Sequence, residues 1–311
     1  MSRSPQIPDS RETAALTREM HVERRGVEDI TLAPSRISQN QTEPSSADSQ
    51  ERELHPPKPE TERIQAEYRD RNRTYRLRDS EIIALAQIGV FRAVNKDDLA
   101  QYAYAGNQAR MESDLRNLSH QSLIERHTLV GFKGDTPTIV TLTRDGQKFL
   151  RHSRVLPTDQ ATYHGLRKPK EARHDAELYR LYQKVASEIV SKGGKNLRVS
   201  LDYELKKHLY RDLATRGQGE EDPDRKAEIA ARHGLRVVAN KIPIPDMRIE
   251  YDTPDLDRAK VDLELSTSHY RPRQMAEKAR AGFTLYSHSE DAARLRRILD
   301  DREITLEILS L

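Results

Sequence analysis

Apolar residues recur with helical spacing through the second quarter of the chain and then alternate as they do in strands. Ser80, Asn95 and Thr143 each precede such a segment and can cap a helix N-terminus. The predicted elements are a helix capped by Ser80, helices over residues 96–104 and 108–120, strands over residues 123–130 and 138–142, and a helix over residues 145–152. The pattern therefore predicts one folded unit over residues 75–154.

A second run of periodic segments follows after a polar stretch and predicts a larger unit over residues 174–311. It begins with a helix over residues 175–190, which ends at two glycines. The remaining predicted elements are strands over residues 197–201, 241–251, 260–267 and 305–309, and helices over residues 203–216, 227–233 and 290–299 and from residue 271. The fold class expected for the whole chain is a mixture of α+β and α/β, with no internal repeat.

One predicted strand of this second unit carries acids in strict alternation with apolar residues. Its two faces are Val261, Leu263 and Leu265 on one side and Asp262, Glu264 and Ser266 on the other. A hairpin with the preceding strand would bring Asp246 close to Glu264. Adjacent carboxylates can bind Mg²⁺. A solvated face of an antiparallel sheet would carry the same acids without any ligand, and both interpretations are open from sequence alone.

Composition narrows the range of structures and functions that this chain can have. Residues 1–57 are polar and aperiodic, which predicts a disordered tail, and residues 58–74 are charged enough to form a solvated lead-in helix. Residues 155–173 are expected to be a polar linker. The net charge of +3 permits nucleic-acid binding without demanding it, and the absence of cysteine excludes disulfides and thiolate metal sites. With no membrane-length apolar run, a cytoplasmic protein is expected.

The first unit resembles a winged helix-turn-helix domain, with three helices, two strands and the ending Thr141-Leu142-Thr143-Arg144-Asp145. The resemblance implies that the third helix enters the major groove of duplex DNA and that the wing follows the backbone. Arg, Asn and Gln can make paired bonds to base edges. The expected DNA-binding residues are Asn107, Gln108, Arg110, Arg116, Asn117 and, near the wing tip, Lys133. A winged helix used for homodimer formation is the alternative.

The acid-bearing segment resembles the PD-(D/E)xK nuclease superfamily, a group of restriction-endonuclease-like folds. Pro245-Asp246 and Glu264 match the two acids of its motif, whereas Ser266 stands where the motif has lysine. The resemblance implies Mg²⁺ bound by Asp246 and Glu264, with Glu204 as a third ligand, and Lys278 from the following helix in place of the missing lysine. Alternatively, Asp262 and Glu264 form the acidic pair without a lysine, so Asp262 is also a candidate catalytic residue.

The order of these parts resembles the replication-relaxation proteins of plasmids and mobile elements over roughly residues 75–290. The resemblance is carried by the winged helix, by His174-Asp175, Tyr203-Glu204 and Pro245-Asp246, and by the strand of Glu264. It implies a role in plasmid replication, relaxation or mobilisation, within a replication or relaxase complex. Three functions stay open: a DNA-binding protein with an inactive nuclease-like domain, an active Mg²⁺-dependent endonuclease, and a winged-helix transcription regulator or dimerisation module.

Overall fold

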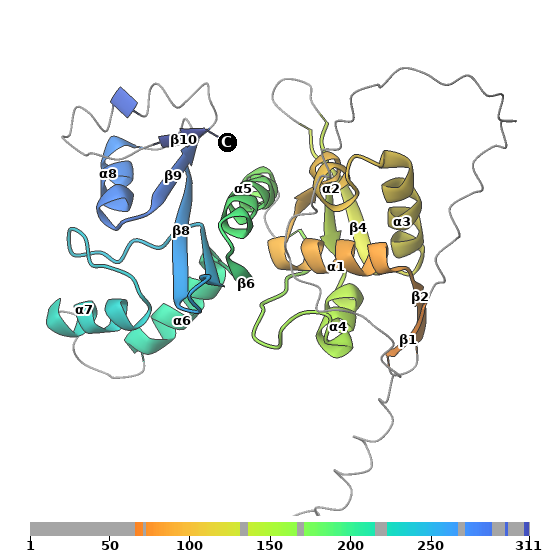
Figure 1. Cartoon of the computed structure of the whole chain (residues 1–311), viewed down its shortest axis with the longest axis horizontal. Coiled ribbons are helices and arrows are strands. Elements are labelled where there is room, and N and C mark those ends of the chain that lie inside the picture. Colours follow the sequence, from red (N-terminus) through yellow and green to blue (C-terminus); the bar gives the residue numbers. More distant parts are fainter. Residues whose placement is uncertain are drawn as a thin grey trace, which may run out of the picture. The chain divides into compact units, whose positions relative to one another are not determined.

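The chain is a mixed α/β protein, seen in a computed structural model that describes residues 66–70, 73–130, 136–166, 171–214, 223–266, 271–287, 296–297 and 308–310. These residues form eight helices and ten strands in three sheets (Figure 1). The predicted tail over residues 1–57 and most of the predicted helix over residues 290–299 lie outside the described residues.

The first unit combines helices with two antiparallel sheets. Its elements are β1 (Ala66–Asp70), β2 (Arg73–Leu77), α1 (Asp79–Phe91), β3 (Val94–Asn95), α2 (Lys96–Ala103), α3 (Gln108–His120), β4 (Ile124–Thr128), β5 (Thr138–Leu142) and α4 (Arg144–Ser153). Strands β3, β5 and β4 form one sheet in that order, with β5 in the centre. The three helices and two strands predicted from the sequence are therefore observed in the predicted order.

Two of the three predicted helix caps are confirmed. The Asn95 side chain accepts a hydrogen bond from the N–H of Asp97, and that of Thr143 accepts one from Gly146. The prediction for Ser80 is wrong, because α1 begins at Asp79 and its N-cap residue is Arg78, two residues earlier. The Ser80 hydroxyl instead donates to Asp114 at 2.6 Å, so Ser80 ties α1 to α3.

The predicted lead-in helix over residues 58–74 is wrong over its described part. Strands β1 and β2 form an antiparallel hairpin there. The rings of Tyr68 and Tyr75 lie edge-on to Phe149 of α4, with centroids 5.7 and 5.4 Å away. The charge of this segment favoured a solvated helix, but aromatic packing against α4 decides its structure.

The predicted linker over residues 155–173 is anchored to the folded core in its described part. The side-chain amide of Gln160 accepts from the N–H of Val199 at 3.1 Å and donates to its carbonyl at 2.8 Å. The N–H of Tyr163 donates to Gly89 at 2.7 Å. Val199 lies on an edge strand, β6, so Gln160 satisfies backbone groups that have no neighbouring strand on that side.

The second unit is built on a five-stranded mixed sheet. Its elements are α5 (Ala172–Ser191), β6 (Lys195–Leu201), α6 (Asp202–Ala214), α7 (Pro223–Arg232), β7 (Met247–Asp252), β8 (Arg258–Ser266), α8 (Pro272–Arg280), β9 (Thr284–Ser287) and β10 (Ile308–Ser310). The strand order is β10-β9-β8-β7-β6. Strands β6, β7 and β8 are antiparallel neighbours, whereas β8, β9 and β10 run parallel.

The predicted hairpin of residues 241–251 with residues 260–267 is confirmed, but its first strand is shorter than predicted. Strand β7 begins at Met247, after Pro243 and Pro245. Proline cannot donate to a ladder, so these two residues keep the segment before Asp246 out of the sheet. Asp246 therefore stands at the entrance of β7.

The two faces of this sheet differ in chemistry. The apolar face carries buried residues of the three antiparallel strands, namely Val199, Leu201, Met247, Ile249, Leu263 and Leu265. Helix α5 lies on one side of the sheet and α8 on the other (Figure 1). The opposite face carries charged residues of the same strands. Two of them, Arg248 and Lys260, donate hydrogen bonds to the carbonyls of His233 and Gly234, just after α7.

No helix among the described residues combines the length and apolar character needed to cross a bilayer.

Candidate active site and nucleic-acid interface

Three residues from separate segments meet at the end of the charged face, two through their side chains and Asp246 through its main-chain N–H. Glu264 Oε2 accepts a hydrogen bond from Lys278 Nζ at 2.8 Å and one from the N–H of Asp246 at 3.3 Å. Asp246 Oδ2 in turn accepts from the N–H of Leu265 at 2.9 Å. The acids predicted to be neighbours are thus neighbours, and Lys278 joins them.

Sheet register explains why these residues meet. Met247 pairs with Leu263 across the antiparallel ladder, so Asp246 at the entrance of β7 lies beside Glu264 near the end of β8. The parallel pairing of β8 with β9 requires a crossover, and α8 supplies it. Lys278 in the last turn of α8 thereby returns to the end of β8.

The acids of β8 do not lie on a solvated face. Glu264 is fully buried, and the Asp262 side chain is 11% exposed. The interpretation of this strand as a solvated sheet face is therefore wrong. A buried carboxylate must be paired to be tolerated, and here each acid has a cationic partner.

Lys278 is held in place by more than its ion pair. Its ammonium also donates to the carbonyl of Ile244 at 2.6 Å and lies 5.5 Å from the centre of the Phe283 ring. Ser266, where the superfamily motif has lysine, is buried, and its hydroxyl has no hydrogen-bond partner among the described residues. Lys278 of α8 thus supplies a cation beside Glu264, whereas position 266 is an uncharged serine.

His174 is a member of this cluster that the sequence analysis did not predict. Its Nε2 lies 3.6 Å from Asp246 Oδ2, from the first turn of α5. Burial alone would lower the pKa of His174, but its contact with the Asp246 carboxylate and the charges of Asp246, Asp175 and Glu177 outweigh that effect and raise the pKa to about 9. Its contact with Asp246 is long-range, so no local sequence pattern reveals it.

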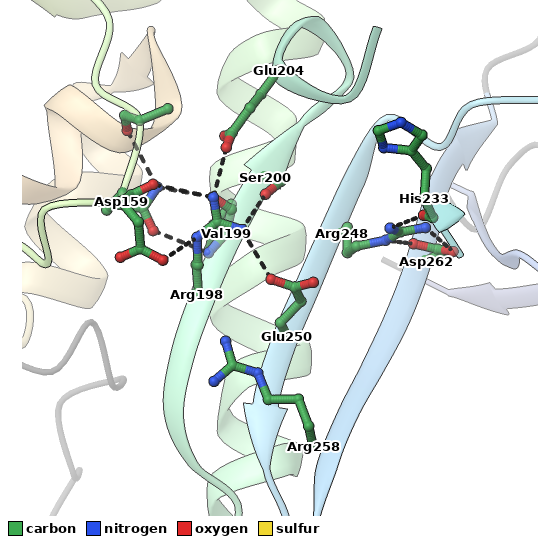
Figure 2. A network of polar contacts seen from close by, with 12 residues as sticks. Asp159, Arg198, Val199, Ser200, Glu204, His233, Arg248, Glu250, Arg258 and Asp262 are labelled. Carbon is green, nitrogen blue, oxygen red and sulfur yellow. Dashed lines mark hydrogen bonds and ion pairs between the residues drawn. The ribbon is translucent and has the colours of Figure 1, made fainter. Parts of the chain in front are cut away.

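Asp262, the other candidate catalytic acid, is engaged elsewhere. Its two carboxylate oxygens accept from Arg248 at 2.6 and 2.9 Å, as Figure 2 shows. The same guanidinium donates to the carbonyl of His233 at 2.7 Å. Asp262 and Arg248 therefore form a bidentate ion pair between β8 and β7, and Arg248 also connects this pair to the segment after α7.

Glu204, the predicted third metal ligand, also belongs to a separate network. Its Oε1 lies 2.7 Å from Arg198, which reaches Glu250 at 2.9 Å and Asp159 at 3.1 Å (Figure 2). Burial raises the pKa of Glu204 above its ordinary value, although the charge of Arg198 opposes that shift. The structure places Glu204 against Arg198 on the charged face of the sheet.

The candidate metal ligands of this cluster are two carboxylates, those of Asp246 and Glu264. Among the described residues, no three His, Asp or Glu side chains are arranged to hold a metal ion. Mg²⁺ is usually bound through one or two carboxylates, with water and substrate phosphate filling the other positions. Asp246 and Glu264 supply such a pair of carboxylates.

The predicted DNA-binding face of α3 is only partly exposed. Gln108, Arg110 and Arg116 are exposed. The Asn107 side chain caps α3 by accepting from the N–H of Arg110 at 3.0 Å. Asn117 is turned inward and donates to Glu81 at 2.7 Å, so its amide holds α3 against α1. Lys133 lies outside the described residues.

The two acids of α3 are both neutralised within the first unit. Asp114 is fully buried and accepts from Arg78 at 2.8 Å. Glu112 lies 2.9 Å from both Lys96 and Arg126, and these contacts lower its pKa below the ordinary value. The exposed surface of α3 therefore keeps its cationic arginines without opposing acids.

Comparison with known proteins identifies no relative, because no family model, curated protein or solved structure matches this chain.

Proposed function

We propose that this chain binds duplex DNA through its first unit and carries a Mg²⁺-dependent phosphodiesterase site in its second. The observation that supports the site is the meeting of Asp246, Glu264 and Lys278, which come from three separate segments, around one carboxylate oxygen. In this proposal the second unit is a PD-(D/E)xK nuclease-like domain whose lysine comes from α8. The replication-relaxation resemblance gives the biological setting: plasmid or mobile-element DNA during replication, relaxation or mobilisation.

The proposed chemistry is hydrolysis of a DNA phosphodiester. Mg²⁺ bound by Asp246 and Glu264 would polarise the phosphate and lower the pKa of the attacking water. The water would form a new P–O bond and lose a proton to the solvent, while the bond to the leaving oxygen breaks and that oxygen takes a proton from the solvent. Lys278, already fixed beside Glu264, offsets the negative charge that grows on the phosphate. His174 Nε2 lies 3.6 Å from Asp246, and in its protonated form it would add a second positive charge at the same place.

DNA binding by the first unit is supported by its element order and by the charge of α3. A helix whose acids are both paired, and whose exposed residues include Arg110 and Arg116, suits the negatively charged groove of duplex DNA. In this proposal the first unit is a winged helix-turn-helix domain with α3 as its recognition helix.

The decisive experiment is cleavage of supercoiled plasmid with Mg²⁺ or with EDTA. The full chain should nick or linearise the plasmid only with the metal, and Asp246→Ala and Lys278→Met should each abolish cleavage. Lys195→Met, which changes an exposed lysine of β6, is the matched control and should cleave as the parent does. Cleavage that persists in Asp246→Ala would contradict the assignment.

A second candidate function is DNA binding without cleavage, and Ser266 in place of the motif lysine favours it. Melting curves with Mg²⁺ separate the two. A cation that binds only the native state stabilises it by about 2.7 kcal/mol at a concentration one hundred times its Kd. A melting shift that Asp246→Ala removes, without any cleavage by the parent, would establish a metal-binding site that has lost its chemistry.

A further inference from the structure

Helix α6 exposes two tyrosines on a face that also carries three cationic side chains. Tyr203 and Tyr210 are 51% and 56% exposed, although large aromatic side chains usually lie inside. They are seven residues apart, so they share one face and stand about 10.5 Å apart along the helix axis. The exposed positions of α6 are Tyr203, Lys206, Lys207, Tyr210, Arg211 and Ala214.

The other side chains of α6 either pack in the core or form ion pairs. Leu209 is buried, and Leu205 and Leu213 pack against the same apolar cluster, so the opposite face of the helix belongs to the core. The three acids of α6 all have cationic or histidine partners: Asp202 pairs with Lys206 at 2.6 Å, Glu204 is buried against Arg198, and Asp212 lies 2.9 Å from His233 and 3.3 Å from Arg211. The two tyrosines therefore lie beside Lys206, Lys207 and Arg211, two of which also contact acids of the same helix.

This face begins at the candidate active site. The N–H of Asp202, the first residue of α6, donates to the carbonyl of Asp246 at 3.0 Å. Tyr203 follows immediately, and its ring lies edge-on to that of Tyr163, with centroids 6.4 Å apart. The contact with Tyr163 restricts the ring of Tyr203 before any ligand arrives, which reduces the entropy lost on binding.

We infer that this face of α6 binds a single-stranded DNA segment, with unpaired bases stacked on Tyr203 and Tyr210 and with phosphates near Lys206 and Lys207. Aromatic rings interleaved with cations are the recognition chemistry of single strands, because stacking needs an open base face and the backbone is anionic. In a duplex each base is already stacked on its neighbours, so a tyrosine reaches a base face only where the strand is unpaired.

This inference names a substrate class for the proposed nuclease site, and it rests on the proposed function for the cleavage of the phosphodiester bond. A strand held along α6 from Tyr210 to Tyr203 continues toward Asp246, so the substrate class would be DNA with an unpaired segment next to the cleaved phosphate. Such DNA occurs in forks, flaps and the underwound regions of a supercoiled plasmid. Duplex DNA on α3 and a single strand on α6 would then be two separate contacts.

Binding of labelled oligo(dT) of about 16 nucleotides, the upper end of known site sizes, tests the inference by fluorescence anisotropy. EDTA in the buffer removes cleavage from the measurement. Changing Tyr203→Ala and Tyr210→Ala together should weaken binding by about 25-fold or more, since each stacked base contributes at least about fivefold. Tyr203→Phe with Tyr210→Phe keeps both rings and should bind as the parent does.

Two controls separate this inference from folding and from the proposed function. Leu256→Ser removes another exposed apolar side chain of the same unit and should leave oligo(dT) binding unchanged. Arg110→Ala with Arg116→Ala should weaken duplex binding alone. Melting curves of the phenylalanine pair, the arginine pair and Leu256→Ser should match the parent, whereas the alanine pair should lose at most about 0.5–1.5 kcal/mol through the missing ring contact with Tyr163.

Three outcomes would overturn the inference, whatever the plasmid assay shows. The parent could fail to bind oligo(dT), which would leave the α6 face to a protein partner. The alanine pair could bind as the parent does. The phenylalanine pair could lose as much affinity as the alanine pair, which would show that the hydroxyls bind and the rings do not stack. If oligo(dT) binds as expected but the plasmid is not cleaved, only the nuclease proposal is refuted.

Discussion

The pair of Arg248 and Asp262 offers a direct test of whether Asp262 is structural or catalytic. The two side chains are 6% and 11% exposed, and the guanidinium also donates to the carbonyls of His233 and Gly234. Figure 2 shows Arg248 with Asp262 and His233. Arg248→Met would leave Asp262 as an unpaired buried charge and deprive both carbonyls of their donor. Removing one partner of a buried pair costs about 3–5 kcal/mol.

The two halves of the pair should not respond equally. In Asp262→Asn the buried guanidinium loses the carboxylate charge, but it keeps both backbone carbonyls as hydrogen-bond acceptors and can still donate to the amide oxygen. That change should therefore cost about 1.5–3 kcal/mol, the range for a hydrogen bond to a charged group. For Arg248→Met the expected cost corresponds to a melting temperature lower by roughly 6–20 °C.

Urea denaturation at neutral pH, with and without Mg²⁺, measures both changes. Arg258→Met is the matched control, because Arg258 lies on the same hairpin but is 60% exposed and its contact with Asp252 is 3.6 Å long. An exposed pair of this kind contributes about 0–1 kcal/mol. Equal costs for Arg248→Met and Arg258→Met would refute the reasoning. Asp262→Asn with parental stability but no stabilisation by Mg²⁺ would identify Asp262 as a metal ligand.

Three further outcomes follow from contacts in the first unit and its connection to the second. Arg110→Ala with Arg116→Ala should make the salt dependence of duplex binding shallower by about 0.9 in logarithmic slope per lost phosphate contact, and a parental slope would exclude this face. Asn95→Ala should cost about 0.5–2 kcal/mol in thermal unfolding through loss of a confirmed cap. Gln160→Ala should cost about 1–3 kcal/mol by leaving both backbone groups of Val199 without a partner, whereas a freely exposed linker residue would cost nothing.

The sequence by itself determined the elements whose cause is local. Helix α3 and strand β5 have the predicted bounds, and Asn95 and Thr143 cap the predicted helices, because a cap depends on residues within one turn. The alternation along β8 and the prolines before Asp246 were enough to predict that Asp246 and Glu264 are neighbours. The roles of these residues in metal binding and cleavage stay predictions.

Tertiary structure decided which partner each charged residue takes. His174 meets Asp246, Asp262 is paired with Arg248, and Glu204 is paired with Arg198, although all three pairs come from different elements.

Tertiary packing also decided the structure of two segments whose composition had predicted something else. The charged segment before α1 becomes a hairpin because its tyrosines pack on Phe149, and the polar linker is anchored where Gln160 bonds to the edge of β6. A carboxylate looks the same in the sequence whether it will be buried, paired or solvated. The choice depends on desolvation and on the cation that the fold places beside it, which are properties of three-dimensional position and not of sequence spacing.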